Sequence, residues 1–195
     1  LCMSKKYDLL VFIGRFQPFH LAHLEIIRRA TTLATHVLVI TGSANQPRTY
    51  KNPFTSSERA NMIKSATSGL ELAVEVVTNP DSMYNDSAWA VRIQALVSNY
   101  TQLAFNSKPV NIGIIGHKKD LTSDYLNMFP QWSLEEVALI EPLNATDVRD
   151  LYFKSDANMN FIKNVVPRST FDFLSEFLRF HAFLHLSSFF DRIPH

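Results

Sequence analysis

Two histidines follow a glycine and an arginine near the amino terminus, in the segment GRFQPFHLAH over residues 14–23. Gly14 ends an apolar run, so we expect a ligand to approach the backbone there. A helix is expected to begin near His20, and its first turn would offer free amides and the positive end of its dipole to an anion. His20 and His23 are three residues apart and therefore share one face of that helix. Because imidazoles donate hydrogen bonds whether neutral or protonated, this pattern predicts a polyphosphate site.

Two other interpretations of the histidines remain open from the residues alone. One histidine would cap the helix while the other packs in the core, or the pair would bind zinc. A zinc site needs three or four ligands, and no further ligand stands nearby in the sequence. The single cysteine, Cys2, also excludes a cysteine-rich zinc site and an intramolecular disulfide. We therefore expect no metal site held by protein side chains alone.

Arginines provide further candidates for contact with phosphate. Arg15 directly follows Gly14 and is placed to hold phosphate charge as it shifts during a reaction. Thr146 is expected to cap a short helix, and Arg149, one turn further on, offers a planar fork for phosphate. For Arg149 the alternative is a surface ion pair, and for Arg48 it is a solvated charge on a loop.

Short apolar runs alternate with stretches of helical spacing along the chain. The runs predict strands at 7–13, 37–41, 72–77, 110–115 and 137–140. The helical stretches lie at 20–34, 55–68, 86–103 and 119–128, with another beginning at Thr146 and more from 167 onward. The second helix has a capping-box pattern, Thr55 with Glu58. Alternating strands and helices are typical of an α/β fold with a parallel sheet, here of about five strands with helices on both faces.

The unusual residues follow the carboxyl ends of the predicted strands. They fall in the segments 14–23, 42–51, 81–89, 116–120 and 144–149. In open parallel sheets, ligands bind at this edge, where the strand order reverses. We therefore expect the five segments to form one site.

Composition limits both the class of protein and its partners. The chain has 195 residues, 46% hydrophobic and 19% charged, with a formal net charge of +1. At roughly 150 residues per domain, residues 1–195 predict a single domain. The near-neutral charge argues against binding to nucleic acid or to acidic membranes.

The sequence also bears on location. The apolar stretch 171–190 is interrupted by Asp172, Glu176 and Arg179, which a membrane-spanning helix would not normally carry. The first residues are too poor in apolar side chains for a signal peptide. With the low cysteine usage, these features predict a cytoplasmic protein.

The segment 14–23 resembles the HxGH-type signature of the nucleotidyltransferase superfamily, with Ala22 where the superfamily normally has glycine. More specifically, it is similar to nicotinamide mononucleotide (NMN) adenylyltransferases of the archaeal type and of the bacterial bifunctional adenylyltransferase/Nudix proteins. Three further blocks follow in the family's order, and the resemblance extends from about residue 7 to residue 153. The blocks are GSA at 42–44 with KNPFT at 51–55 and ER at 58–59, GHKKD at 116–120 with FPQW at 129–132, and NATDVR at 144–149, where the superfamily has ISxTxxR.

The resemblance implies a Rossmann-like nucleotidyltransferase fold and a reaction in which ATP and NMN give NAD and pyrophosphate. The phosphate of NMN, already ionised near neutral pH, would attack the α-phosphorus of ATP in line, so no general base is needed. Catalysis would then consist of positioning and of neutralising charge on the α-phosphate and the leaving pyrophosphate. Mg²⁺ is the implied cofactor, bridging phosphate oxygens with few protein ligands.

The resemblance also assigns roles to individual residues. The implied catalytic residues are His20, His23, Arg15 and Arg149. The implied ATP contacts are Gly14, Arg15, Phe16, His20, His23, Gly116, His117, Lys118, Asp120, Asn144, Thr146 and Arg149. The implied NMN contacts are Phe16, Gly42, Ser43, Lys51, Asn85 and Trp89, with the indole facing the pyridine ring and Asn85 facing the carboxamide. Without the resemblance, Trp89 would be interpreted as a core residue.

Three rival functions remain. One is another transferase of the superfamily, such as a phosphopantetheine adenylyltransferase or a cytidylyltransferase, against which segments 85–89 and 116–120 argue. Another is a nucleotide-binding remnant without turnover, against which the intact His20, His23 and Arg149 argue. The third is a fragment of a class I aminoacyl-tRNA synthetase, for which the short, nearly neutral chain leaves little surface to bind tRNA.

The carboxyl-terminal part of the chain predicts an extension rather than a second enzyme. The bifunctional relatives carry a Nudix domain whose signature needs glycines, and no glycine follows Gly116. We therefore expect no Nudix domain. The phenylalanine-rich residues 165–195 predict a helical extension that either mediates homo-oligomerisation or is the remnant of a lost partner domain.

Overall fold

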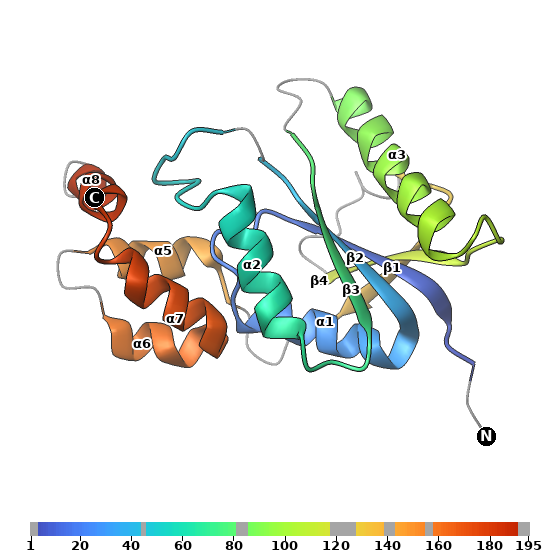
Figure 1. The fold of residues 1–195 in the computed structure, drawn as a ribbon, viewed down its shortest axis with the longest axis horizontal. Helices are drawn as coiled ribbons and strands as arrows, with labels where there is room; N and C mark the ends of the chain where they lie inside the picture. Colours follow the sequence, from blue (N-terminus) through green and yellow to red (C-terminus); the bar gives the residue numbers. More distant parts are fainter. Residues whose placement is uncertain are drawn as a thin grey trace.

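The computed structural model describes residues 4–43, 46–80, 86–117, 128–138, 143–154 and 158–190. Its centre is a parallel sheet with the strand order β3-β2-β1-β4-β5 (Figure 1). The strands are β1 (Tyr7–Gly14), β2 (Ala34–Thr41), β3 (Ala73–Thr78), β4 (Ile112–His117) and β5 (Ser133–Val137). The strand order reverses between β1 and β4, and this reversal sets the position of the expected site.

Helices cover both faces of the sheet, as predicted. They are α1 (Leu21–Leu33), α2 (Ser56–Thr67), α3 (Asp86–Ala104), α5 (Ala145–Phe153), α6 (Met159–Val165), α7 (Arg168–Phe177) and α8 (His181–Phe190). Successive residues of β1 point to opposite faces. Leu10 and Phe12 pack in one hydrophobic cluster with α1, α2 and the carboxyl-terminal helices. Leu9 and Val11 pack in a second cluster with α3. β1 is therefore buried on both faces, which explains why its sequence is a continuous apolar run and does not alternate with polar residues.

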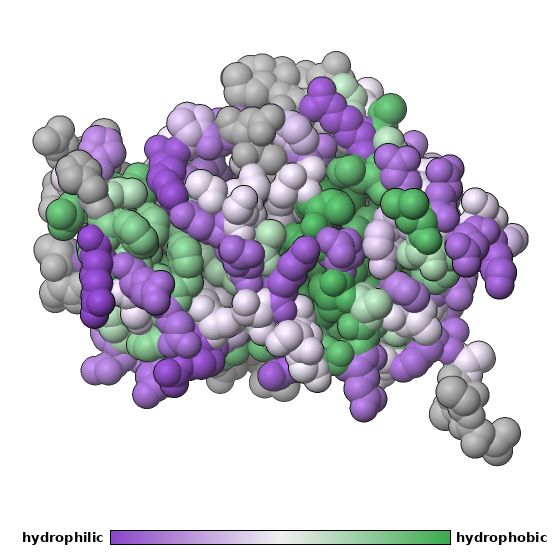
Figure 2. Space-filling model, in the orientation of Figure 1, coloured by the Kyte–Doolittle hydropathy of each residue, from purple (hydrophilic) through white to green (hydrophobic). Residues whose placement is uncertain are grey.

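The carboxyl-terminal helices pack against the rest of the domain through aromatic rings. Phe177 of α7 meets Phe54 with ring centroids 5.3 Å apart, and the Tyr152 hydroxyl of α5 donates to the Leu174 carbonyl at 2.7 Å. The sequence predicted helix from 167 onward, but it did not predict α6 or the break at residues 178–180. Figure 2 shows apolar residues gathered over these helices and over the edge strand β3. Phe180 is 57% exposed.

Two predicted strands, β5 and β2, differ most from the structure in where they begin. β5 ends at Val137 and begins at Ser133, so the predicted strand at 137–140 was placed too late. β5 is an edge strand, whose outer residues need no apolar side chains, so the apolar run did not mark it. β2 begins at Ala34, three residues before the predicted start at 37, because Ala34 already pairs with Tyr7 of β1. The polar residues at 35 and 36 hid this start from the sequence analysis. The predicted helix at 119–128 lies outside the described residues, apart from Met128.

Among the described helices, none has the length and apolar character needed to cross a membrane.

Candidate active site

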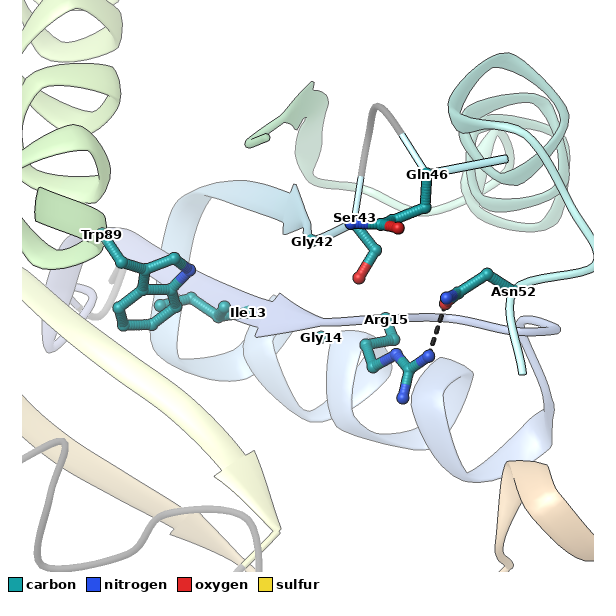
Figure 3. A pocket seen from close by; sticks show the side chains of 8 residues that line it. All are labelled: Ile13, Gly14, Arg15, Gly42, Ser43, Gln46, Asn52 and Trp89. Atoms are coloured by element: carbon teal, nitrogen blue, oxygen red, sulfur yellow. Dashed lines mark hydrogen bonds between the residues drawn. The ribbon is translucent and has the colours of Figure 1, made fainter. Parts of the chain in front are cut away.

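A cavity of about 440 Å³ opens at the carboxyl ends of β1 and β2 (Figure 3). It brings together five residues that the sequence assigned to a site: Gly14, Arg15, Gly42, Ser43 and Trp89. Its other lining residues are Ile13, Gln46 and Asn52, which the sequence analysis did not single out. The structure therefore joins the predicted segment after β1, the segment after β2 and the start of α3 around one space.

Gly14 lines the cavity and also makes room for a neighbouring side chain. A Cβ built on Gly14 would come within 2.8 Å of the Phe16 ring, so the lack of a side chain at this position lets that ring pack here. Phe16 has a positive φ of 52° and is 1% exposed. Its ring packs edge-on against Phe12 and His23, with centroids 5.2 and 4.8 Å apart. Any contact of Phe16 with a ligand must therefore be made through its backbone.

The two histidines stack on each other at the start of α1. His20 is the N-cap residue, in an extended conformation, and its backbone N–H donates to Nδ1 of His23 at 3.2 Å. The two ring centroids lie 3.6 Å apart, with 15° between the ring planes. His20 is 3% exposed, and its Nδ1 has no hydrogen-bond partner. The side chain that caps the start of α1 is therefore that of His23, which accepts from the His20 backbone. His20 Nδ1 is buried and has no hydrogen-bond partner, which is rare for a buried polar atom.

Burial keeps both imidazoles neutral. It lowers the pKa of His20 to about 3. It also lowers the pKa of His23 well below its usual value, and the neighbouring His20 lowers it further. Because Nδ1 of His23 accepts a hydrogen bond, the proton of the neutral ring lies on Nε2. The opening turn of α1 can therefore donate hydrogen bonds to an anion without holding a fixed charge of its own.

Arg149 reaches back from α5 to the loop that carries the histidines. Its Nη1 donates to the Gln17 carbonyl at 2.7 Å, and its Nη2 donates to Oγ1 of Thr146 at 3.0 Å. Arg149 is 7% exposed, and its Nε has no partner. Burial lowers its pKa, and the nearby Arg15 lowers it further. These contacts rule out the surface ion pair and place two guanidinium groups beside the histidine loop.

The N-cap residue of α5 is Asn144. The sequence analysis had placed the cap at Thr146, so that prediction was wrong. The Asn144 side chain accepts from the Thr146 N–H at 2.9 Å, which satisfies an amide of the first turn. The Thr146 hydroxyl is then left to accept from Arg149.

Arg15 is held at the mouth of the cavity by the segment after β2. Its guanidinium donates to the Lys51 carbonyl at 3.2 Å and to Oδ1 of Asn52, as Figure 3 shows for the latter. The Lys51 side chain is exposed and does not line the cavity. Arg48 is not a solvated charge, because it pairs with Glu58 at 2.7 Å and lies over the Phe177 ring. Burial would raise the pKa of Glu58, but hydrogen bonds from Arg48 and Thr55 outweigh burial and lower it.

Other predicted residues lie around this edge of the sheet. Trp89 is partly buried, and its ring centroid is 5.9 Å from that of Phe129. Gly116 and His117 end β4, with Gly116 buried and His117 partly exposed. Asn85, Lys118 and Asp120 lie outside the described residues.

Two buried polar side chains lie within the matched segments but were given no role from the sequence. Gln17 exchanges two hydrogen bonds of 3.0 Å with the Phe54 backbone, as a strand partner would. Arg59 is 0% exposed and donates to the backbone carbonyls of Thr55 and of three residues that line the cavity. The spacing of Arg59 with Met62 and Ile63 places it on the buried face of α2, and this spacing was the available signal.

The described residues include no group of three or more histidine, cysteine or acidic side chains placed to hold a metal ion.

Comparison with known proteins assigns the family. The Cytidylyltransferase-like family matches residues 11–163, and the chain belongs to this family. Over 173 residues, it is 38% identical to a nicotinamide/nicotinic acid mononucleotide adenylyltransferase of Acinetobacter baylyi, covering 88% of this chain and 87% of the other. It is 28% identical over 175 residues to the nicotinamide-nucleotide adenylyltransferase of Saccharolobus solfataricus, covering 85% and 89%.

Solved structures agree with this assignment. The bifunctional NMN adenylyltransferase/ADP ribose pyrophosphatase of Francisella tularensis has a TM-score of 0.80 and 26% identity, over 97% of this chain. This chain spans 58% of the length of that one. A second structure of the same protein, with a TM-score of 0.78, is a complex with AMP and a manganese ion.

Proposed function

We propose that this protein transfers the adenylyl group of ATP to nicotinamide mononucleotide, giving NAD and pyrophosphate. The observation that carries the proposal is the stacked, neutral pair His20 and His23. The pair follows a loop whose Gln17 carbonyl accepts from Arg149, and the same loop begins at Arg15, which lines the cavity. A chain 38% identical over most of both lengths carries the same activity in its name.

The ATP side of the proposed site is built from the start of α1 and the start of α5. His20 and His23 donate to the triphosphate, together with the free amides of the first turn of α1. Arg149 and Arg15 offset the charge that grows on the leaving pyrophosphate. Gly116 and His117 at the end of β4 lie toward the adenosine, with Lys118 and Asp120 proposed from the resemblance.

The NMN side is the cavity beside β1 and β2. Trp89 supplies a flat face for the pyridine ring, and Gly42 and Ser43 form the opposite wall. Asn52 and Arg15 bring polar groups to the mouth, where the 5′-phosphate would face ATP. Lys51, exposed beside them, adds charge for the approaching mononucleotide.

The chemistry asks for no proton transfer from the protein. The NMN phosphate is ionised near neutral pH and forms a bond to the α-phosphorus of ATP as the bond to pyrophosphate breaks. The protein contributes orientation and neutralisation of charge, which dominate phosphoryl-type transfers. Mg²⁺ is proposed to enter with ATP, bound to its phosphate oxygens.

The direct test is an assay of the purified protein with ATP, Mg²⁺ and either NMN or nicotinic acid mononucleotide, following dinucleotide by chromatography and pyrophosphate by a coupled assay. Equal amounts of dinucleotide and pyrophosphate are expected from at least one mononucleotide. Phosphopantetheine with ATP, and CTP in place of ATP, serve as controls for the rival transferases. Pyrophosphate release with only a control substrate, or ATP binding without any product, would contradict the proposal.

A further inference from the structure

A fully buried arginine lies beneath the cavity wall without lining the cavity. Arg59 stands in the first turn of α2, and its Nη1 donates to the carbonyls of Arg15 and Gly42, each at 2.7 Å. Its Nη2 donates to the Ser43 carbonyl and its Nε to the Thr55 carbonyl, each at 3.3 Å. One guanidinium therefore joins the end of β1, the end of β2 and the cap of α2.

The carbonyls that Arg59 holds belong to the cavity wall. Arg15, Gly42 and Ser43 all line the cavity, and the Gly42 N–H donates to the Gly14 carbonyl at 3.0 Å. Ser43 has a positive φ of 55°, a left-handed conformation that disfavours a residue with a Cβ. Such a conformation persists where surrounding contacts hold it, and Arg59 supplies one of them.

The direction of these carbonyls matters for an anion. An oxygen that accepts from Arg59 directs negative partial charge into the protein, because Arg59 is buried and does not line the cavity. The guanidinium also leaves a positive charge beneath the wall, where low polarity screens it weakly. Both effects favour a phosphate-bearing ligand in the cavity.

We propose that Arg59 is a positioning residue for the mononucleotide: it fixes the wall formed by Arg15, Gly42 and Ser43 and directs their carbonyls away from the bound phosphate. This inference rests on the proposed function, and it adds a residue to which the family resemblance gave no role. Arg59 touches neither substrate in this account. Because it bonds the backbone of Arg15 and not the Arg15 guanidinium, it acts more on affinity for the mononucleotide than on the transfer step.

The test replaces Arg59 by lysine, which keeps the charge but lacks the planar fork that reaches several carbonyls at once. We expect Arg59→Lys to raise the KM for the mononucleotide by at least about tenfold, the usual scale for a lost hydrogen bond to a charged group, while kcat falls less than about threefold. The KM for ATP should change little. Arg59→Met, which also removes the charge, should raise the mononucleotide KM further if it folds.

The matched control is Tyr152→Phe. Tyr152 is also buried in a helix and also donates to a backbone carbonyl, that of Leu174, away from the cavity. We expect this control to lower Tm as Arg59→Lys does, but to leave the mononucleotide KM unchanged. A lowered Tm with an unchanged KM in Arg59→Lys would reduce Arg59 to a stabilising residue and overturn the proposal.

A readout without turnover separates this inference from the proposed function. Hydrogen exchange of the Gly42 amide should become faster in Arg59→Lys than in Tyr152→Phe, because its bond to Gly14 depends on the wall being held. Fluorescence of Trp89, in a Trp132→Phe background, gives mononucleotide affinity without ATP. If the unaltered protein makes no dinucleotide, the proposed function fails, and these two measurements still decide for or against Arg59. Unchanged exchange at Gly42, or unchanged affinity, overturns the positioning role.

Discussion

The opening turn of α1 and the cavity beside β1 and β2 belong to one edge of the sheet, but they present their polar groups in different ways. At the opening turn, His20 and Arg149 are buried and each keeps a nitrogen without a partner. At the cavity, Arg15 is exposed, and its guanidinium is already bonded to the segment after β2. Buried groups that lack a hydrogen-bond partner can bond directly to a ligand. In an open cavity, the fit of the ligand depends instead on the position of the lining residues. We therefore expect changes at the opening turn to act on kcat and changes at the cavity wall, apart from the Arg15 guanidinium, to act on the KM for the mononucleotide.

The largest effect is expected from the histidines. His20→Ala or His23→Ala removes a donor aimed at charge that develops during transfer, and such losses cost about 10²–10³ in kcat. Turnover measured with both substrates saturating checks this, with circular dichroism to confirm the fold. The matched control is His36→Ala, because His36 packs on Phe105 away from the cavity. Rates in His20→Ala equal to those of the control would break the comparison.

Arg149→Lys should have the next largest effect. Lysine keeps the charge but cannot bond both the Gln17 carbonyl and Thr146 in the plane of a fork, so we expect kcat to fall by about tenfold to a hundredfold. Steady-state kinetics with each substrate varied in turn measures it. A change confined to the mononucleotide KM would assign Arg149 to the cavity and contradict the division between the two regions.

Trp89→Ala tests the cavity and should act on the KM for the mononucleotide. Loss of the indole face should raise the mononucleotide KM by about tenfold, the scale of one aromatic contact with its buried area, and leave kcat within about threefold. Trp89→Phe should recover most of the affinity. An unchanged mononucleotide KM in Trp89→Ala would remove the pyridine ring from this cavity.

The smallest effect concerns stability and pH. The pKa of His20 is about 3 in the folded protein and near 6.5 in the unfolded chain, so the unfolded state binds the extra proton between these values. The free energy of unfolding is therefore unaffected by this group above pH 6.5. Below pH 6.5 it falls by about 1.4 kcal/mol per pH unit, because only the unfolded chain binds the proton. His20→Asn keeps an N-cap residue and should flatten this slope in urea unfolding measured at pH 4–7. An equal slope in both proteins would show that His20 is not neutralised by burial.

The sequence predicted those parts of the site that depend on local patterns. The capping box at α2 is present, with Thr55 and Glu58 exchanging hydrogen bonds of 2.8 and 3.3 Å. Within the described residues, the predicted strands and helices occur in the expected order, with α6 in addition. An apolar run followed by helical spacing is a local signal. The bonds that Gln17 and Arg59 make were not predictable in this way. Their partners are backbone atoms of distant segments, and a backbone carbonyl has no signature in the sequence.

Gly14 and β5 show the same limit. Gly14 was expected to admit a ligand, and it lines the cavity, but it also makes room for the ring of Phe16. No pattern of residue types predicts the positive φ of this phenylalanine. All residues of β5 except Val137 are exposed or partly buried, which suits an edge strand, while the more apolar residues after it placed the predicted start four residues too late. Local chemistry therefore indicates which residues gather at an edge, and tertiary packing decides which of them face the ligand.

The central claim is that the stacked histidines bind the phosphates and that the mononucleotide's own oxygen displaces pyrophosphate in a single step. The most direct measurement is the stereochemical course at the α-phosphorus, using ATP with one α-oxygen replaced by sulfur in a single configuration. Inversion of configuration in the dinucleotide product is the predicted result. Retention would mean that a side chain, such as one of the two histidines, first takes the adenylyl group, and it would contradict the account.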